Sequence, residues 1–375
     1  MKKRKILIII PSLIAGGAER VLVNLLRTID RSKYEISLFL GEDKGELRKD
    51  IPEDVKIFHI YRNKFLRKIS ELFYAKLGTP LLLKLFGRKI KGNFDVGISF
   101  LDSIASEFLF YNNAIITKKA IVIHSSYKSY DNYMKFIKGA YRKRLINRYS
   151  KVDTIISVAE EALSEFKELF GEFPDMRVIY NPMNIHDIKE KANDSTQIIK
   201  HSDGLKIVAV GNLLPVKGYD LLFEACEILK NKNVDFHLTV LGEGFLREEL
   251  ERLIQNLDLN DNITLKGFVR NPYPYVKDAD IYVMTSVSEG LPTALCEALI
   301  LGKPSLTVNV PGCREVVGNS EYGILVERTK KGIADGILQL CASDMREYYH
   351  EKALERAKIF NDEIAIGQYY NIFDA

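Results

Sequence analysis

Two carboxylates stand eight residues apart in the stretch SEGLPTALCEAL, residues 288–299. Pro292 suits the first turn of a helix, so Glu289 precedes the predicted helix and Glu297 lies inside it. One acid can then meet the hydroxyls of a sugar and the other those of a ribose, while free amides at the helix start suit a phosphate. The residues at that start are Gly290, Leu291 and Pro292. Capping by Glu289 and solvent exposure of Glu297 are the alternatives, but apolar neighbours indicate that Glu297 is largely buried and needs a partner.

Three further positions carry residue types that bind anions or sugars. In GNLLPVKG, residues 211–218, Lys217 can neutralise a diphosphate, although a surface lysine is an equally good interpretation. Gly16 and Gly17 separate a predicted strand from a predicted helix, so an anion can approach the backbone there; a tight turn is the alternative. His124 closes the predicted strand AIVIH, where a histidine on its own is more often structural.

Alternating strands and helices are predicted to position these residues. Short β-rich runs alternate with helical-period segments, which is the pattern of parallel sheets covered by helices. The strands predicted in the first half are Ile6–Ile10, Ile36–Leu40, Lys56–Ile60, Val96–Phe100, Ala120–Ile123 and Thr154–Val158. Those predicted in the second half are Lys206–Val210, Phe236–Leu241, Ile263–Lys266, Ile281–Met284, Ser305–Thr307 and Gly323–Val326. Each half is therefore predicted to be a doubly wound α/β domain with its ligands at the carboxyl ends of the strands.

The boundary between the halves falls close to the polar segment KEKANDSTQIIKHSDG, residues 189–204. We predict an N-terminal domain over residues 1–182, a C-terminal domain over 183–355 and a final helix, 356–375, that crosses back to the first domain. The two halves also begin alike, because KILIIIPSLIAGG and KIVAVGNLLPVKG both run from a lysine and an apolar strand into a glycine loop.

Residues 1–20 have a second interpretation, since basic residues followed by an apolar run are typical of a secretory signal peptide. Pro11 interrupts that run, and Lys5–Ile10 provides the first strand that the domain pattern requires. A buried strand is therefore favoured over a signal peptide.

The composition is that of a globular protein, with 46% hydrophobic and 28% charged residues in a chain of 375. No apolar run approaches the roughly 20 residues that a membrane-spanning helix needs. The four cysteines form no zinc or disulfide pattern, which fits a reducing cytosol. They are Cys226, Cys296, Cys313 and Cys341.

Positive charge is concentrated in the first half of the chain. Residues 1–180 contain 33 Lys and Arg against 21 Asp and Glu, whereas the remainder contains 21 against 29. Segment 61–92 has nine basic residues and one acidic, and segment 118–151 has ten and one. Solvated helix faces are the plain interpretation. Because apolar residues alternate with the cations of 61–92, an anionic membrane surface is favoured over nucleic acid as a partner.

Motifs along nearly the whole chain resemble those of the retaining glycosyltransferases of group 1. They are GGAER after the first strand, GNLLPVKG, VLGEG (240–244), LKGFV (265–269), the pair of glutamates eight residues apart, GKPSLTVNVPGCREVV (302–317) and GILVE (323–327). This resemblance implies the GT-B fold, in which two Rossmann-like α/β domains face a central cleft. It also implies a nucleotide-sugar donor bound mainly by the second domain and an acceptor bound mainly by the first.

The resemblance further implies roles for individual residues. Glu297 would hold the ribose hydroxyls, Glu289 the hydroxyls of the donor sugar near the reacting centre, and Lys217 the diphosphate. Gly17 would approach the phosphate from the other side, and His124 would lie beside the donor sugar.

The resemblance also implies contacts for the base and the diphosphate of the donor. The stretch from Gly267 to Val269 would lie against the base. Many family members have arginine at the position of Asn212, so this chain keeps one lysine where they have two cations. Either backbone amides suffice, or another cation such as Arg20 or Arg270 reaches the diphosphate.

The sequence DAD, residues 278–280, matches the metal-binding motif of a different glycosyltransferase fold. It directly precedes the predicted strand Ile281–Met284, at the amino end and away from the expected cleft, so we predict a structural role. Neither a metal nor a cofactor is expected, because cations and helix dipoles can stabilise a departing diphosphate.

The resemblance therefore predicts an enzyme that moves a hexose or N-acetylhexosamine from a UDP-sugar, with retention, to a membrane-lipid-linked glycan in cell-surface polysaccharide synthesis. We expect it in the cytoplasm, peripheral at the inner face of the cell membrane, with segment 61–92 against the bilayer. Two alternatives stay open, a nucleotide-sugar 2-epimerase of the same fold and an inactive partner subunit of a transferase. Asn212 supports the inactive subunit, whereas the intact pair of Glu289 and Glu297 argues against it.

Overall fold

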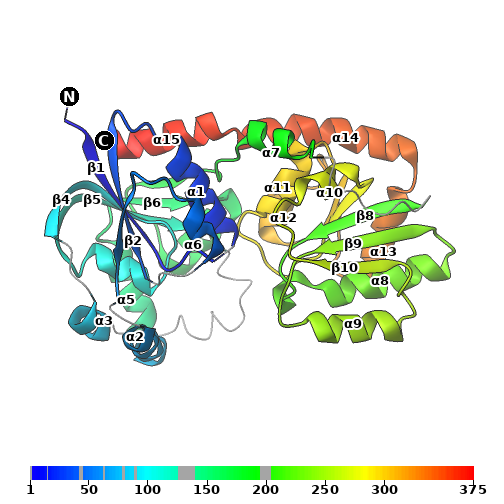
Figure 1. Ribbon diagram of the computed structural model, residues 1–375, viewed down its shortest axis with the longest axis horizontal. Coiled ribbons are helices and arrows are strands. Elements are labelled where there is room, and N and C mark those ends of the chain that lie inside the picture. Colours follow the sequence, from blue (N-terminus) through cyan, green and yellow to red (C-terminus); the bar gives the residue numbers. More distant parts are fainter. Residues whose placement is uncertain are drawn as a thin grey trace. The chain divides into compact units, whose positions relative to one another are not determined.

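The chain forms two compact units, each a parallel sheet flanked by helices (Figure 1). Unit 1 comprises Met1–Pro182 together with Asp362–Ala375, and unit 2 comprises Met183–Asn361. The computed structural model describes residues 2–14, 16–41, 45–61, 64–77, 81–87, 91–125, 140–194 and 204–375.

Unit 1 has a seven-stranded sheet in the order β3-β2-β1-β4-β5-β6-β7, with every described strand pair parallel. Its strands are β1 (Arg4–Ile10), β2 (Tyr34–Leu40), β3 (Lys56–His59), β4 (Lys91–Ser99), β5 (Asn113–Ile123), β6 (Thr154–Ser157) and β7 (Met176–Val178). Its α-helices are α1 (Gly17–Thr28), α2 (Lys64–Leu77), α3 (Leu81–Phe86), α5 (Ala140–Tyr149), α6 (Glu160–Phe170) and α15 (Asp362–Asp374). Two short 3-10 helices, η1 (Glu46–Asp50) and η2 (Ile104–Leu109), complete it.

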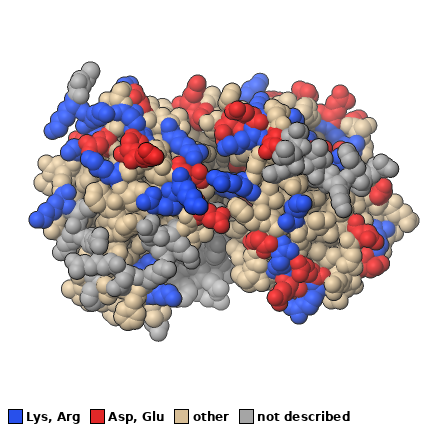
Figure 2. Space-filling view, viewed as in Figure 1, with Lys and Arg blue, Asp and Glu red and all other residues tan. Residues whose placement is uncertain are grey.

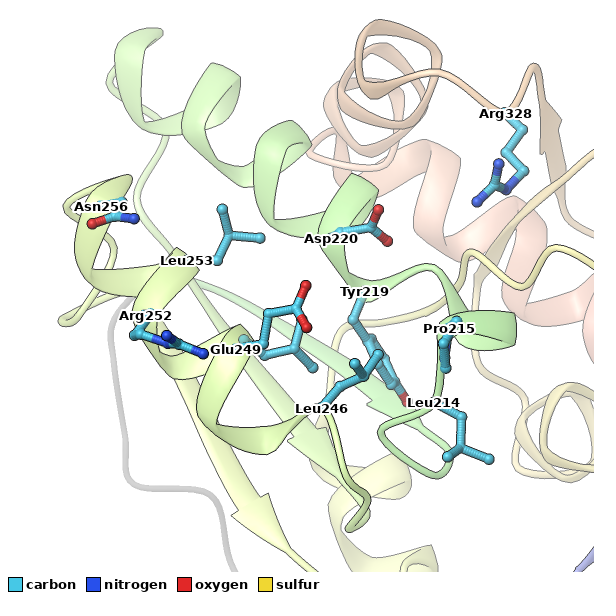
Figure 3. Close-up of a pocket in the computed structure, with 11 residues that line it drawn as sticks. Leu214, Pro215, Tyr219, Asp220, Leu246, Glu249, Arg252, Leu253, Asn256 and Arg328 are labelled. Atoms are coloured by element: carbon cyan, nitrogen blue, oxygen red, sulfur yellow. The ribbon is translucent and has the colours of Figure 1, made fainter.

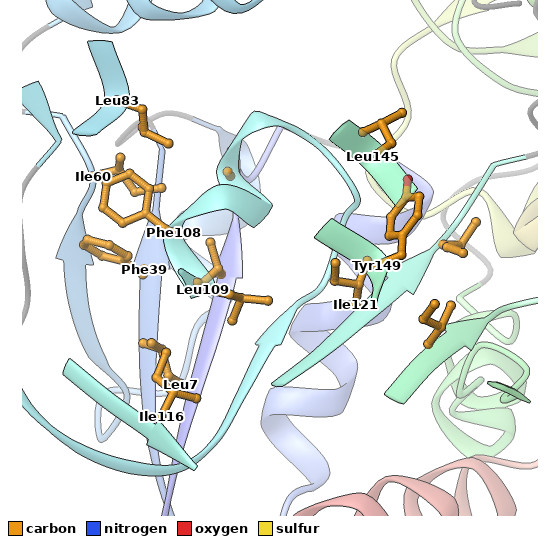
Figure 4. Packing of buried hydrophobic residues seen from close by; sticks show 14 of the residues in the cluster. Leu7, Phe39, Ile60, Leu83, Phe108, Leu109, Ile116, Ile121, Leu145 and Tyr149 are labelled. Carbon is orange, nitrogen blue, oxygen red and sulfur yellow. The ribbon is translucent and has the colours of Figure 1, made fainter. Parts of the chain in front are cut away.

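The core of unit 1 follows from its apolar strands. Residues Ile6–Ile10 of β1 are completely buried, as expected for a strand with neighbours and helices on all sides. Phe39 of β2 and Phe108 of η2 meet edge to face, with ring centroids 4.9 Å apart, in the cluster that Figure 4 shows. Helix α15 closes the unit, because Tyr370 stacks on Tyr34 with ring centroids 5.1 Å apart. The hydroxyl oxygen of Tyr370 also accepts a hydrogen bond from the backbone amide of Asp30 at 2.8 Å.

Unit 2 has a six-stranded parallel sheet in the order β10-β9-β8-β11-β12-β13. Its strands are β8 (Leu205–Val210), β9 (Phe236–Leu241), β10 (Ile263–Gly267), β11 (Ile281–Met284), β12 (Ser305–Val308) and β13 (Ile324–Val326). Its α-helices are α7 (Ile185–Lys191), α8 (Tyr219–Asn231), α9 (Arg247–Asn256), α10 (Tyr273–Asp278), α11 (Thr293–Ile300), α12 (Pro311–Val317), α13 (Lys330–Gln339) and α14 (Ser343–Ala357). The 3-10 helices are η3 (Pro215–Lys217) and η4 (Lys358–Phe360).

All twelve predicted strands are present, two of them with the predicted bounds, Phe236–Leu241 and Ile281–Met284. Strands β4 and β5 begin several residues earlier than predicted, because their polar first halves pair with each other, Lys91 opposite Asn113, where little apolar pattern exists. The short edge strand β7 was not predicted. Residues 4–10, part of the segment with a second interpretation as a signal peptide, form the inner strand β1, between β2 and β4. Among the described helices, none combines the length and the apolar character needed to cross a bilayer.

Candidate functional site

The strand order of unit 2 reverses between β8 and β11, which are neighbours in the sheet although two strands, β9 and β10, lie between them in the sequence. Open α/β sheets bind ligands outside the carboxyl ends of the strands at such a switch point. The loops that follow β8 and β11 are residues 211–218 and 285–292, and they carry Lys217 and Glu289. The order of the strands therefore brings two of the predicted site residues to the edge where a ligand is expected.

Lys217 and Glu289 form an ion pair, with 2.7 Å between Nζ and Oε1. The two loops are also joined through Thr285, whose hydroxyl donates to the carbonyl oxygens of Lys217 and Gly218, each at 3.0 Å. Gly218 has a left-handed backbone with φ of 63°, and a Cβ there would lie 2.5 Å from the carbonyl oxygen of Thr285. Glycine at this position therefore permits the close approach that holds cation and carboxylate together.

Glu297 lies on α11, eight residues after Glu289, and accepts a hydrogen bond from Tyr273 with 3.1 Å between Oη and Oε1. Its neighbours Leu295, Cys296 and Ala298 are fully buried, so the helix is apolar around this carboxylate, as the sequence predicts. One partner of this half-buried carboxylate is thus a tyrosine from α10.

Besides burial, the negative charges of Glu289 and Glu297 both affect the pKa of one tyrosine, Tyr282. Burial raises the pKa of Tyr282 on β11, and the charges of Tyr219, Glu289 and Glu297 raise it further. Burial, followed by the charge of Glu289, also raises the pKa of Tyr219. Glu289 and Glu297 therefore influence one region of unit 2 despite their separation along the chain.

The start of α11 and the loops after β8, β9 and β10 bring the remaining predicted residues of unit 2 to the same edge. Leu291 is buried, and the carbonyl oxygen of Gly290 lies where a side chain at residue 312 would point. Pro292 caps α11 without a side-chain hydrogen bond. Asn212 is exposed, whereas Val269 is half-buried. Gly267 has φ of 87°, and its carbonyl oxygen accepts the amide of residue 242 at 2.8 Å.

In unit 1 the glycine pair lies after β1, beside the switch point between β1 and β4. Gly16 caps α1, and Gly17 is its first residue. The carboxylate of Glu19 folds back over this helix start, since its Oε2 lies 2.3 Å from where a Cβ of Gly16 would be. Burial raises the pKa of Glu19, and a hydrogen bond with its own backbone opposes that rise. A carboxylate therefore already lies at the position where an anion was expected.

His124 follows β5, and its ring lies 5.1 Å from that of Phe100, which follows β4. Its Nε2 is buried and has no hydrogen-bond partner within the residues that the structure describes. Burial lowers the pKa of His124 to about 4, against a smaller opposite effect of a backbone hydrogen bond with Phe100. The imidazole is therefore neutral at pH 7.

The burial of His124 predicts a pH-dependent loss of stability. The unfolded chain takes up the proton first as the pH falls below about 6.5, so His124 should destabilise the folded state by about 2 kcal/mol at pH 5 relative to pH 7. Replacing His124 with glutamine should remove this contribution from the pH dependence of urea unfolding. His186, with a side chain 91% exposed, supplies the control His186→Gln, which should leave the profile unchanged. Identical pH profiles for wild type and His124→Gln would contradict the prediction.

The DAD motif is held by lysines at the amino end of the unit 2 sheet. Asp280 accepts the backbone amide of Lys206 at 2.8 Å, and Asp278 pairs with the Nζ of Lys206 at 3.4 Å. Nearby, the Nζ of Lys303 donates to the carbonyl oxygen of residue 279 at 2.9 Å. These contacts give the motif the structural role predicted for it.

A separate pocket of about 680 Å³ lies between η3 and helices α8 and α9 (Figure 3). Tyr219 and Leu246 lie in its apolar floor, and Arg328 lies at one end beyond Asp220. Lys217, Glu289 and Glu297 do not line it. These three candidate residues are therefore outside the pocket lining, although the lining residues Pro215 and Tyr219 lie two positions on either side of Lys217 in the chain.

Two parallel doubly wound sheets, each flanked by helices, define an α/β protein of the GT-B class. The family Glycosyl transferases group 1 matches residues 190–356, and Glycosyltransferase Family 4 matches residues 15–187. The chain belongs to this glycosyltransferase family, a family of retaining hexosyltransferases, and is therefore an enzyme.

Two relatives support this assignment, and one of them matches along almost the full length of both chains. The chain is 31% identical to an N-acetylgalactosamine-N,N'-diacetylbacillosaminyl-diphospho-undecaprenol 4-alpha-N-acetylgalactosaminyltransferase of Campylobacter jejuni, over 97% of this chain and 98% of that one. It is 26% identical to a poly(ribitol-phosphate) alpha-N-acetylglucosaminyltransferase of Staphylococcus aureus, over 71% of this chain and 53% of that one.

Solved structures share the fold. TarM of S. aureus matches with a TM-score of 0.75 at 17% identity, covering 100% of this chain and 99% of that one. HepE of Anabaena in complex with UDP matches with a TM-score of 0.73 at 16% identity, covering 99% of both chains.

Sequence reasoning identified the two glutamates and the lysine but not the tyrosines around them. Tyr273 follows an Asn-Pro pair, and Tyr282 is one of several apolar residues in β11, so neither carries a sequence signal of its own. Glu19 was part of the quoted GGAER motif, but nothing in its spacing indicates that it folds back over the glycines.

Proposed function

We propose that this glycosyltransferase moves a hexose or N-acetylhexosamine from a UDP-sugar to a glycan carried by a membrane lipid. The observation that carries the proposal is the ion pair of Lys217 and Glu289 at the switch point of unit 2, with Glu297 oriented on the adjoining helix. A cation beside a carboxylate matches a sugar diphosphate, which presents negative charge next to hydroxyl groups.

The relatives support the choice of substrates. The C. jejuni relative is named for transfer of N-acetylgalactosamine to a glycan on diphospho-undecaprenol. Structures of the same fold have been solved with UDP and with UDP-glucose. A UDP-sugar donor and a lipid-linked acceptor are therefore the substrates that we assign to this chain.

In the proposed reaction the bond between the anomeric carbon and the diphosphate oxygen breaks first, and the departing UDP keeps the electron pair. Lys217 neutralises the diphosphate, and Glu289 holds the hydroxyls of the donor sugar. The acceptor hydroxyl then attacks the same face of the anomeric carbon and gives its proton to the diphosphate, so the configuration is retained. Glu297 holds the ribose, and the stretch from Gly267 to Val269 lies against the base.

Asn212 and Glu19 change what the resemblance implies for phosphate binding. Asn212 is exposed and adds no charge, so Lys217 is the cation that we assign to the diphosphate. An anion that binds at Gly16 and Gly17 requires the carboxylate of Glu19 to turn away from the start of α1. Such a movement would exchange one anion for another at the same helix start.

The proposed acceptor lies at a membrane, and helices α2 and α3 carry the apolar side chains that such a location requires. Four of them are highly exposed, Phe65 (69%), Leu72 (58%), Leu81 (48%) and Leu85 (64%). Segment 61–92, which contains both helices, has nine basic residues and one acidic. On the visible face of unit 1, most other lysine and arginine side chains lie above α2 and α3 (Figure 2). Apolar insertion and attraction to anionic lipid would therefore act together.

This location predicts that replacing exposed apolar residues of α2 and α3 with polar ones weakens membrane binding. Replacing Leu72 and Leu85 together with serine should lower the partition onto vesicles of phosphatidylglycerol and phosphatidylcholine at least tenfold, because each exposed leucine can contribute on the order of 1 kcal/mol when it enters the interface. Phe245 of unit 2 is 75% exposed, so Phe245→Ser is the matched control and should bind like the wild type. Equal loss of binding in both variants, or none in either, would argue against this orientation.

The function itself is tested by product analysis with UDP-sugars and a lipid-linked glycan acceptor. We expect release of UDP together with growth of the glycan by one sugar, and the anomeric configuration of the new bond should be the same as that of the donor. An isomeric nucleotide-sugar formed without acceptor would identify a 2-epimerase instead. Donor binding without transfer or hydrolysis would identify an inactive partner subunit.

A further inference from the structure

The carboxylate of Glu297 is oriented by a second helix. Tyr273 is the first residue of α10, and its hydroxyl donates to Oε1 of Glu297 at 3.1 Å. The two residues lie 24 positions apart in the chain, and both side chains are half-buried. A donor from α10 therefore meets an acceptor from α11 directly at the edge that carries the candidate site.

The backbone of Tyr273 is itself fixed. Asn271 accepts the amide of Tyr273 through Oδ1 at 3.3 Å and donates through Nδ2 to the carbonyl oxygen of Lys191, the last residue of α7, at 2.9 Å. Pro272 lies between them with φ of −78°, which its ring restricts. The phenol is thus presented by a short helix that is tied to α7 and cannot easily turn away.

The hydrogen bond from Tyr273 favours one conformation of the flexible Glu297 side chain. A glutamate side chain has several rotatable bonds, and ordering it when a ligand binds costs affinity. A carboxylate can accept about four hydrogen bonds, so one from a tyrosine leaves capacity for the hydroxyls of a ligand.

We propose that Tyr273 is a positioning residue that holds Glu297 ready for the ribose and so contributes to the selection of ribonucleotides. The inference rests on the proposed function, in which Glu297 binds the ribose hydroxyls. The alternative is that Tyr273 only packs α10 against α11, and that alternative predicts equal effects on nucleotides with and without these hydroxyls.

The experiment compares the binding of UDP with that of 2′,3′-dideoxy-UDP by isothermal titration calorimetry. Wild type should prefer UDP. Tyr273→Phe should weaken UDP binding by about three- to tenfold and leave dideoxy-UDP binding nearly unchanged, so the preference falls by the same factor. Tyr275→Phe, which removes a hydroxyl from the same helix, should keep the preference of the wild type. In a Glu297→Gln background, adding Tyr273→Phe should change the preference no further.

The outcomes separate this inference from the function on which it rests. A wild type that does not bind UDP, or that binds both nucleotides alike, overturns the proposed role of Glu297 and this inference with it. If the wild type prefers UDP and Tyr273→Phe shows the same preference, only the positioning role is overturned. This holds whether or not the variant binds both nucleotides more weakly. Thermal unfolding of each variant checks that the fold is retained.

Discussion

Replacing Lys217 with methionine is expected to lower kcat for sugar transfer by about 100- to 1000-fold. The methionine preserves the apolar stem, which lies against Gly211, but removes the charge that faces Glu289 at 2.7 Å. Fixed groups that stabilise charge developing in a transition state contribute on this scale, and the departing diphosphate is where that charge develops. Initial rates with saturating UDP-sugar and acceptor measure the change.

The stability of the protein should respond much less than its activity. An ion pair that is still partly open to solvent contributes up to about 1 kcal/mol to folding, so Lys217→Met should unfold close to the wild type. Lys230 offers a matched control, because its Nζ lies 2.7 Å from Oδ2 of Asp258 in the same unit but away from the candidate site. Lys230→Met should retain full transfer activity. Turnover by Lys217→Met within a few-fold of that by the control would remove this lysine from the mechanism.

Much of the fold follows from apolar pattern, and the exceptions have a physical cause. A buried parallel strand such as Ile6–Ile10 must be apolar on both faces, so its sequence indicates both its existence and its burial. The first half of β5, from Asn113, is paired yet largely exposed, and its stability comes from backbone hydrogen bonds to β4 that leave no apolar signal. Edge strand β7 is only three residues long and carries little pattern for the same reason.

The candidate site was predictable where residue type and spacing carry chemistry. Two acids around a helix start indicate a ligand because an apolar helix such as α11 has no structural need of Glu297. The pairing of Lys217 with Glu289 depends on β8 and β11 being neighbours, which is a property of the strand order and not of any local stretch. The contact of Tyr273 with Glu297 depends on how two helices pack, so no pattern within either helix reveals it.

A second group of charges, inside unit 1, was not predicted from the sequence. The side chain of Arg148 on α5 is 4% exposed, with Nη2 2.6 Å from Oδ1 of Asp102 and Nη1 3.3 Å from Oε1 of Glu107. The hydroxyls of Tyr149 and Tyr74 donate to Asp102 and Glu107 at 2.7 and 3.3 Å. Burial disfavours the guanidinium charge, but Asp102 and the surrounding groups outweigh it, so the pKa of Arg148 is raised above its usual range. One cation thus compensates two buried acids that join η2, α2 and α5.

Replacing Arg148 with methionine is expected to reduce the free energy of unfolding by about 3–5 kcal/mol, because the two acids lose their buried counter-charge. The midpoint of urea unfolding measures the loss. Arg142→Met on the same helix is the control, since Arg142 is exposed and donates to the carbonyl oxygen of Leu169 at 2.7 Å, so its replacement should cost about 1 kcal/mol or less.

The cause of that loss can be separated from simple loss of packing by two further measurements on Arg148→Met. Unpaired buried carboxylates bind protons more tightly than those of the unfolded chain, so the variant should recover stability relative to wild type as the pH falls from 7 to 5. Replacing Asp102 and Glu107 with asparagine and glutamine in the same variant should recover part of the loss at pH 7, because no buried charge then remains unpaired. A deficit that is constant with pH and unchanged in the triple variant would instead mean that the guanidinium acts through its shape and contacts, so that its charge contributes nothing to holding η2 against α5.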